Sequence, residues 1–103
     1  MIVRMWRGRT MAAQADEYVE YMTTTGVARQ RATPGNVGSM ILRREIGDET
    51  EFLVVSLWES LEAVRAFAGD RPEVAVYYPE DDTFLLEFEP EVRHYHASVA
   101  EWD

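Results

Sequence analysis

The stretch Phe52-Leu-Val-Val-Ser-Leu-Trp58, followed directly by Glu59-Ser60-Leu-Glu-Ala-Val-Arg-Ala-Phe67-Ala-Gly69, determines the predicted fold. Its first seven residues are almost all apolar, and β-branched and aromatic side chains among them favour a strand. Ser60 is a suitable N-cap, and Gly69 is a suitable helix end. Between them the apolar residues recur at helical spacing, at Leu61, Val64, Phe67 and Ala68. The stretch therefore predicts a strand that passes directly into an amphipathic helix.

The residues just before this stretch predict a second strand that pairs with it. Residues 37–45 have strand character, and only the turn Gly47-Asp48-Glu49 and three further residues separate them from Phe52. Two strands joined by so short a turn pair in antiparallel fashion.

The amino-terminal third predicts another strand and another helix. Residues 2–9 carry apolar groups on both alternating faces, as in a strand covered on two sides. Thr10 is expected to cap a helix that runs from residue 11 to about residue 25, and Gly26 is expected to end it. Residues 27–36, which include the turn Thr33-Pro34-Gly35-Asn36, are expected to be irregular.

The carboxyl-terminal third predicts a short helix and a last strand. Asp70 is expected to begin the helix with Pro72 in its first turn, and Tyr77-Tyr78-Pro79 is expected to end it. The strand is expected to run from residue 83 towards residue 95, with a bulge or a free edge at Pro90.

The resulting order β-α-β-β-α-β predicts an α+β, ferredoxin-like fold in a single domain spanning residues 1–103. Such a fold has one four-stranded antiparallel sheet with both helices on one face. The strands nevertheless carry large apolar residues on both faces, and a chain of this size cannot leave a whole apolar sheet face in water. We therefore expect a homodimer in which two sheets close into a barrel.

Composition excludes several function classes. The net charge of −9 disfavours nucleic acid and anionic membranes as partners. The absence of Cys removes disulfides and thiolate chemistry, and the absence of Lys among ten basic residues removes Schiff-base chemistry. No targeting signal and no run of about 18 apolar residues is found, so we expect a cytoplasmic protein.

Three motifs carry a resemblance to a known family: residues 57–67 (LWESLEAVRAF), residues 84–90 (FLLEFEP) and residues 34–38 (PGNVG). Through them, nearly the whole chain resembles the antibiotic-biosynthesis monooxygenase-like family of dimeric α+β barrels. The resemblance implies cofactor-free oxidation of aromatic polyketides by dioxygen, haem degradation, or no catalysis at all. Haem-degrading members of the family bind haem with an Asn, a Trp and a His. The corresponding positions in this chain hold Trp6, Phe67 and, approximately, Tyr77. Without that His there is no evident iron ligand, so neither haem degradation nor any other cofactor is expected.

Six residues are candidates for the site. Tyr77 and Tyr78 are candidate catalytic groups because a Tyr hydroxyl can bind a phenolic or quinone oxygen and steer a proton. Alternatively, one ring packs in the core and the other hydroxyl caps a backbone carbonyl. Arg4 is a third candidate, which would stabilise a substrate anion unless it pairs with an acidic residue. Candidates for binding an aromatic ligand are Trp6, Phe67 and Trp58. Because Trp58 belongs to the family's structural strand-to-helix junction, its preferred interpretation is a core residue.

His94 and His96 have the alternation of metal ligands on one strand face, but lie near the carboxyl end, remote from the expected site, and no metal is predicted. The glycines do not form a nucleotide-binding fingerprint. Two main hypotheses stay open: a cofactor-free monooxygenase acting on a small aromatic or polyketide-like compound, and a non-catalytic dimeric binding or stress-associated protein. A third hypothesis is a decarboxylating or dehydratase-like activity, as in other relatives with this fold.

Overall fold

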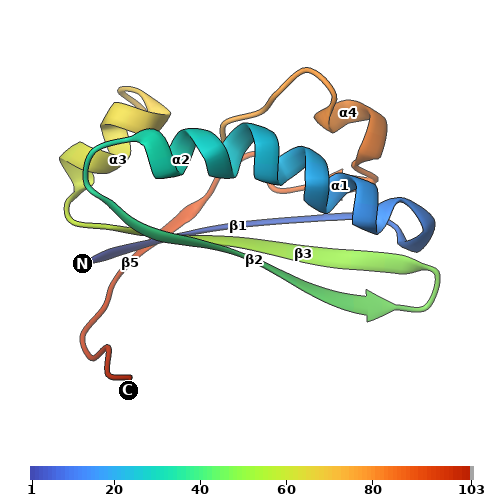
Figure 1. Ribbon diagram of the computed structural model, residues 1–103, viewed down its shortest axis with the longest axis horizontal. Helices are drawn as coiled ribbons and strands as arrows, with labels where there is room; N and C mark the ends of the chain where they lie inside the picture. Colours follow the sequence, from blue (N-terminus) through green and yellow to red (C-terminus); the bar gives the residue numbers. More distant parts are fainter. Residues whose placement is uncertain (103) are drawn as a thin grey trace.

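The computed structural model describes residues 1–102 and contains one antiparallel sheet with all helices on one face (Figure 1). The three long strands are β1 (Ile2–Met11), β2 (Asn36–Ile46) and β3 (Glu49–Trp58), in the spatial order β2-β3-β1. Two short strands, β4 (Glu87–Phe88) and β5 (Arg93–His96), pair with different parts of the outer edge of β1. The predicted ferredoxin-like α+β fold is confirmed.

The β2–β3 hairpin forms as predicted. The strands pair from Ile46 opposite Glu49 to Asn36 opposite Trp58, with one register shift between Asn36 and Gly38. Gly47 in the two-residue turn has a φ of 62°, a conformation that favours glycine over residues with a Cβ.

The first helical region differs from the prediction. Thr10 does not cap it, because Thr10 is fully buried in β1 opposite Thr50. Helical structure instead runs continuously through a 3-10 turn (Ala12–Gln14), α1 (Ala15–Met22), a π-helical turn (Thr23–Val27) and α2 (Ala28–Ala32). The prediction that Gly26 ends the helix is therefore wrong.

The π-helical turn that leads the helix past Gly26 contains three consecutive threonines. The hydroxyls of Thr23 and Thr25 donate to carbonyl oxygens one turn earlier, those of Val19 and Tyr21, both at 2.7 Å. The helix ends only at Thr33, which is extended because Pro34 follows it. Helix α3 (Leu61–Ala68) forms as predicted, and the Ser60 hydroxyl accepts a hydrogen bond from the Ala63 amide at 3.2 Å.

The segment after α3 also differs from the prediction. No helix begins at Asp70; residues 69–80 form an extended strap, and a one-turn helix, α4 (Asp81–Phe84), follows it. The expected strand over residues 83–95 is split into β4 and β5 on either side of Pro90. Because Pro90 cannot donate a ladder hydrogen bond, pairing with β1 stops there and resumes at Arg93.

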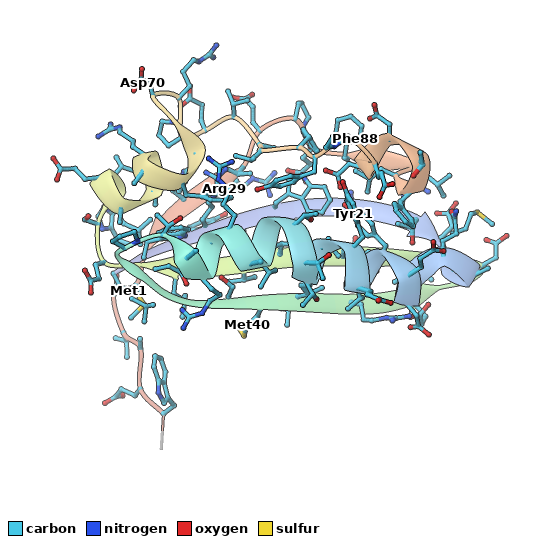
Figure 2. The ribbon with its side chains drawn as sticks, turned by 45° about the horizontal axis from the view of Figure 1, so that its top comes forward. Met1, Tyr21, Arg29, Met40, Asp70 and Phe88 are labelled. Atoms are coloured by element: carbon cyan, nitrogen blue, oxygen red, sulfur yellow. The ribbon has the colours of Figure 1, made fainter. Side chains whose placement is uncertain are left out.

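The core lies between the helices and the sheet face that they cover. One buried cluster surrounds Tyr18 and Phe52, and a second surrounds Trp58, Val64 and Phe67. The opposite sheet face is open: Met40 and Leu42 are 47% and 44% exposed, and Figure 2 shows Met40 pointing away from the helices. No helix among residues 1–102 is long and apolar enough to cross a membrane.

Candidate functional site

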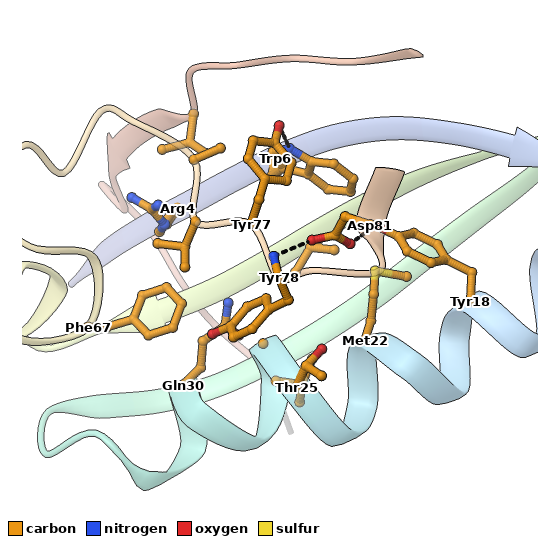
Figure 3. A pocket seen from close by; sticks show the side chains of 16 residues that line it. Arg4, Trp6, Tyr18, Met22, Thr25, Gln30, Phe67, Tyr77, Tyr78 and Asp81 are labelled. Carbon is orange, nitrogen blue, oxygen red and sulfur yellow. Dashed lines mark hydrogen bonds between the residues drawn. The ribbon is translucent and has the colours of Figure 1, made fainter. Parts of the chain in front are cut away.

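A pocket opens between the covered sheet face, the α1–α2 helical region and the strap of residues 69–80 (Figure 3). Its cavity volume is about 70 Å³, below the roughly 300–1,000 Å³ of most small-molecule sites, so a ligand of ordinary size extends into the open mouth. Its wall is mainly apolar, with a few polar groups from each element. Five of the six candidate residues line it: Arg4, Trp6, Phe67, Tyr77 and Tyr78.

Arg4 projects from β1 towards the helices and the strap, because alternation along the strand places Ile2, Arg4 and Trp6 on the covered face of the sheet. It is only 4% exposed. Its guanidinium donates to the carbonyl oxygens of Pro72 and Val74, and Nη1 lies 3.0 Å from Nε2 of His94. Burial lowers the pKa of Arg4 to about 10. Among residues 1–102 no carboxylate pairs with it; its charge instead faces the two carbonyl oxygens, the imidazole of His94 and the ring of Phe67, whose centroid lies 5.8 Å from Cζ.

Trp6 and Tyr77 close one side of the pocket together. The indole Nε1 of Trp6 donates to the hydroxyl of Tyr77 at 2.9 Å, and that hydroxyl donates to the carbonyl oxygen of Glu89 at 2.7 Å. Burial is the main cause that raises the pKa of Tyr77. Gly8 makes this arrangement possible, because a Cβ there would lie 2.4 Å from the Trp6 ring. Tyr77 therefore holds the strap against β1 and β4.

Tyr78 turns in the opposite direction, into the pocket. Its ring lies against Gly26. If Gly26 carried a Cβ, that atom would lie 3.5 Å from Cε2 of Tyr78. The Tyr78 hydroxyl is buried and has no hydrogen-bond partner in the described part of the chain. Its backbone amide donates to Oδ2 of Asp81 at 2.7 Å. The two adjacent tyrosines, which the sequence could not distinguish, thus differ: only Tyr78 presents a free hydroxyl to a ligand.

The pocket residues that the sequence did not single out include the polar side chains of Tyr18, Gln30 and Asp81. The hydroxyl of Tyr18 donates to Oδ1 of Asp81 at 2.9 Å, so the carboxylate ties α1 to the strap. Burial is the main cause that raises the pKa values of both groups. Tyr18 is buried on the inner face of α1, but nothing in the sequence near it marks Asp81 as its partner. Gln30 could have been found only by continuing the helix past Gly26.

Trp58 does not line the pocket, which corrects its assignment as a ligand-binding residue. It is fully buried, its Nε1 donates to the Ser56 hydroxyl at 2.8 Å, and its ring stacks on Phe67 with centroids 5.6 Å apart. Trp58 therefore packs against the side of Phe67 that faces away from the pocket. This agrees with the interpretation of Trp58 as a core residue.

The histidines also need a correction. His94 is not remote from the site, since β5 pairs with β1 and places His94 directly opposite Arg4. Burial, followed by the charge of Arg4, lowers the pKa of His94. Over residues 1–102 no three or more His, Asp or Glu side chains gather in a metal-binding group.

Comparison with known proteins agrees with this architecture. The family model described as "Antibiotic biosynthesis monooxygenase" matches residues 1–97, and the chain belongs to this family. No curated protein matches the sequence.

Three solved structures share the fold. A Bacillus cereus protein assigned to the antibiotic biosynthesis monooxygenases has a TM-score of 0.69 at 14% identity, covering 99% of this chain and 95% of that one. A Streptomyces coelicolor monooxygenase from the gene ActVA-Orf6, in complex with nanaomycin D, has a TM-score of 0.65 at 18% identity, covering 99% and 91%. The haem degrader MhuD of Mycobacterium tuberculosis, with two haems in its active site, has a TM-score of 0.61 at 21% identity, covering 99% and 100%.

The residues of this pocket do not fit a haem site of the kind that the family resemblance implies. No histidine is among the described residues that line it. His94 lies behind the wall with Nε2 directed at Arg4, and the hydroxyl of Tyr77 is already engaged in two hydrogen bonds. An axial imidazole is therefore missing from the cavity wall.

Proposed function

We propose that this chain is a cofactor-independent monooxygenase that oxidises a small aromatic or polyketide-like compound with dioxygen. The observation that carries the proposal is Arg4: a buried guanidinium without a carboxylate partner in residues 1–102, at the wall of an aromatic-lined pocket. Such a charge stabilises an organic anion in a water-poor site far better than it would in water. The nanaomycin D complex of the Streptomyces coelicolor relative supports a small-molecule ligand in this fold.

The proposed chemistry needs no reductant, because the substrate itself supplies the electrons. An activated ring methylene loses a proton to water at the pocket mouth, and the anion formed is stabilised by Arg4. The anion then reduces dioxygen and combines with it. Overall, CH₂ and O₂ give C=O and H₂O, so one oxygen atom enters the product and the other leaves as water.

The residues around Arg4 have distinct proposed roles. The rings of Trp6 and Phe67 bind the flat faces of the substrate. The free hydroxyl of Tyr78 contacts a substrate oxygen, whereas Asp81 is a positioning residue that holds the Tyr78 backbone. We further propose that the working unit is a homodimer joined through the open sheet face.

Oxygen uptake with anthrone, by protein treated with a chelator, tests this function. Arg4→Met is expected to reduce kcat by about ten- to a hundredfold with a smaller change in KM, since its charge acts on an anion that develops during reaction. Arg29→Met is the matched control. Its guanidinium also lies near the Phe67 ring, 5.2 Å from the centroid, but outside the pocket.

Labelled dioxygen provides the second readout, with one labelled atom expected in the product. Uptake that depends on added metal, or equal kcat values for Arg4→Met and wild type, would refute the proposal. An absence of turnover with several anthrones and quinols would favour the non-catalytic binding protein instead.

A further inference from the structure

Two buried polar atoms in the pocket wall have no hydrogen-bond partner in residues 1–102: Oε1 of Gln30 and the hydroxyl of Tyr78. Gln30 as a whole is only 6% exposed. Folded proteins pair the large majority of their buried polar groups, because leaving one unpaired is unfavourable. Two exceptions in one pocket therefore mark a place where a molecule that enters from solvent can supply the missing partner.

The two groups approach the pocket from different elements. Gln30 projects from α2, which reaches the pocket because helical structure continues past Gly26, and Tyr78 projects from the strap. Figure 3 shows the ring of Tyr78 directed towards the side chain of Gln30. Phe67 and the backbone at Gly26, which also line the pocket, offer neither group a partner.

The free atoms define the chemistry of the partner. Oε1 of Gln30 can only accept a hydrogen bond, whereas the Tyr78 hydroxyl can also donate one. A hydroxyl group on a ligand satisfies both, because it donates to one and accepts from the other. An ether oxygen lacks the donor, and a carboxylate would place its lone pairs against those of Gln30.

We propose that Gln30 and Tyr78 together bind the hydroxyl group of a neutral phenolic ring, and that this pair selects phenols over their ethers. The ligand hydroxyl donates to Oε1 of Gln30 and accepts from the hydroxyl of Tyr78. This inference rests on the proposed function in taking the pocket as the substrate site, and it adds the substrate class.

Calorimetric titration with 2-naphthol and 2-methoxynaphthalene at pH 7 tests the selection. We expect wild type to prefer the naphthol by about tenfold, the usual effect of one buried hydrogen bond. Gln30→Met, which keeps the side-chain length but removes the acceptor, is expected to reduce the preference to within about twofold. Tyr78→Phe is expected to reduce it in part, and Gln14→Met, at the other glutamine of the chain, is expected to retain it.

Thermal unfolding without ligand gives an independent readout. Because Gln30 has no partner in the free protein, Gln30→Met is expected to unfold at the wild-type temperature or above it. A lower unfolding temperature, or failure to fold, would mean that Gln30 has an internal structural partner and would overturn the inference. An equal naphthol preference in Gln30→Met and wild type would overturn it as well.

The probes separate this inference from the proposed function, because neither contains an oxidisable methylene. Loss of oxygen uptake with the naphthol preference intact would refute only the monooxygenase proposal. Absence of the preference with oxygen uptake intact would refute only the assignment of Gln30 and Tyr78.

Discussion

The hydroxyl of Tyr77 is held between the Trp6 indole and the Glu89 carbonyl, while the hydroxyl of Tyr78, one residue later, is free within the described chain. Alternation along an extended strap explains the difference, since consecutive side chains point in opposite directions. Arg4 also depends on residues far away in the sequence, because its three hydrogen-bonding contacts all come from residues about 70 to 90 positions later. Individual site residues therefore depend on distant partners.

At this scale, stability is expected to depend on the protonation of His94. The pKa of His94 is lowered by burial first and by the Arg4 charge second, with Glu73 opposing. The unfolded chain therefore binds a proton near pH 6.5 that the folded chain does not yet bind. As pH falls below about 6.5, the free energy of unfolding is expected to decrease, until the pH also passes the lowered pKa.

Urea unfolding between pH 5 and pH 8 measures this dependence. His94→Gln is expected to flatten the curve in this range, whereas His96→Gln, on the same strand but exposed, serves as the control. Identical pH dependence in His94→Gln and wild type would show that His94 is not the responsible group.

At the scale of elements, the π-helical turn Thr23–Val27 sets the shape of the pocket. It joins α1 to α2 without a break, and its residues Thr25, Gly26 and Val27 line the cavity. π-helical turns inside α-helices are frequent at functional sites. The strap completes the opposite wall, because the Asp81 carboxylate and the Arg4 guanidinium anchor its two ends.

The two glycines that face pocket aromatics are expected to respond to alanine with opposite signs. A Cβ at Gly26 meets only Cε2 of Tyr78, at an ordinary 3.5 Å, and the backbone there is helical. Gly26→Ala is therefore expected to stabilise the fold by about 0.5–1 kcal/mol. A Cβ at Gly8 would overlap the Trp6 ring, so Gly8→Ala is expected to destabilise it by about 1–3 kcal/mol.

Chemical denaturation of both variants checks these signs. Destabilisation by Gly26→Ala would indicate that the π-helical turn needs a conformation that alanine does not adopt. A neutral Gly8→Ala would indicate that Trp6 can leave its place over β1 at little cost.

At the scale of the whole molecule, the two sheet faces are unequal. Helices cover one face, while the other presents a group of apolar side chains from four strands. This open face consists of Val3, Met5, Met40, Leu42, Leu53, Val55, Leu57 and Tyr95. Its exposure in one chain is the physical basis for the proposed dimer, because a contiguous apolar patch in water is unfavourable.

Light scattering at micromolar concentration is expected to give twice the 11.9 kDa mass of one chain. Leu42→Asp is expected to weaken association by at least about tenfold, because it removes apolar burial and adds a charge at the interface. It is expected to leave the monomer folded, since Leu42 is 44% exposed there. Leu61→Asp, at an exposed position on α3, is the control, and a stable wild-type monomer would contradict the dimer.

The order of the main elements, the β2–β3 hairpin and the Ser60-capped helix could all be predicted from the amino-acid sequence. These features follow from local patterns: period-2 or helical spacing of apolar residues, a Gly-containing turn, and a serine before an apolar run. The family motifs added the fold and the neighbourhood of the pocket, and five of the six candidate residues do line it.

Only the tertiary structure decided where the first helix ends and which polar groups meet. Gly26 disfavours a helix by about 1 kcal/mol, and burial of helical residues on either side of it, Met22 and Gln30, outweighs this cost. The contacts Tyr18–Asp81 and Arg4–His94 join residues 63 and 90 positions apart. Such pairs are set by how the strap and β5 pack onto α1 and β1, and no local pattern encodes that packing.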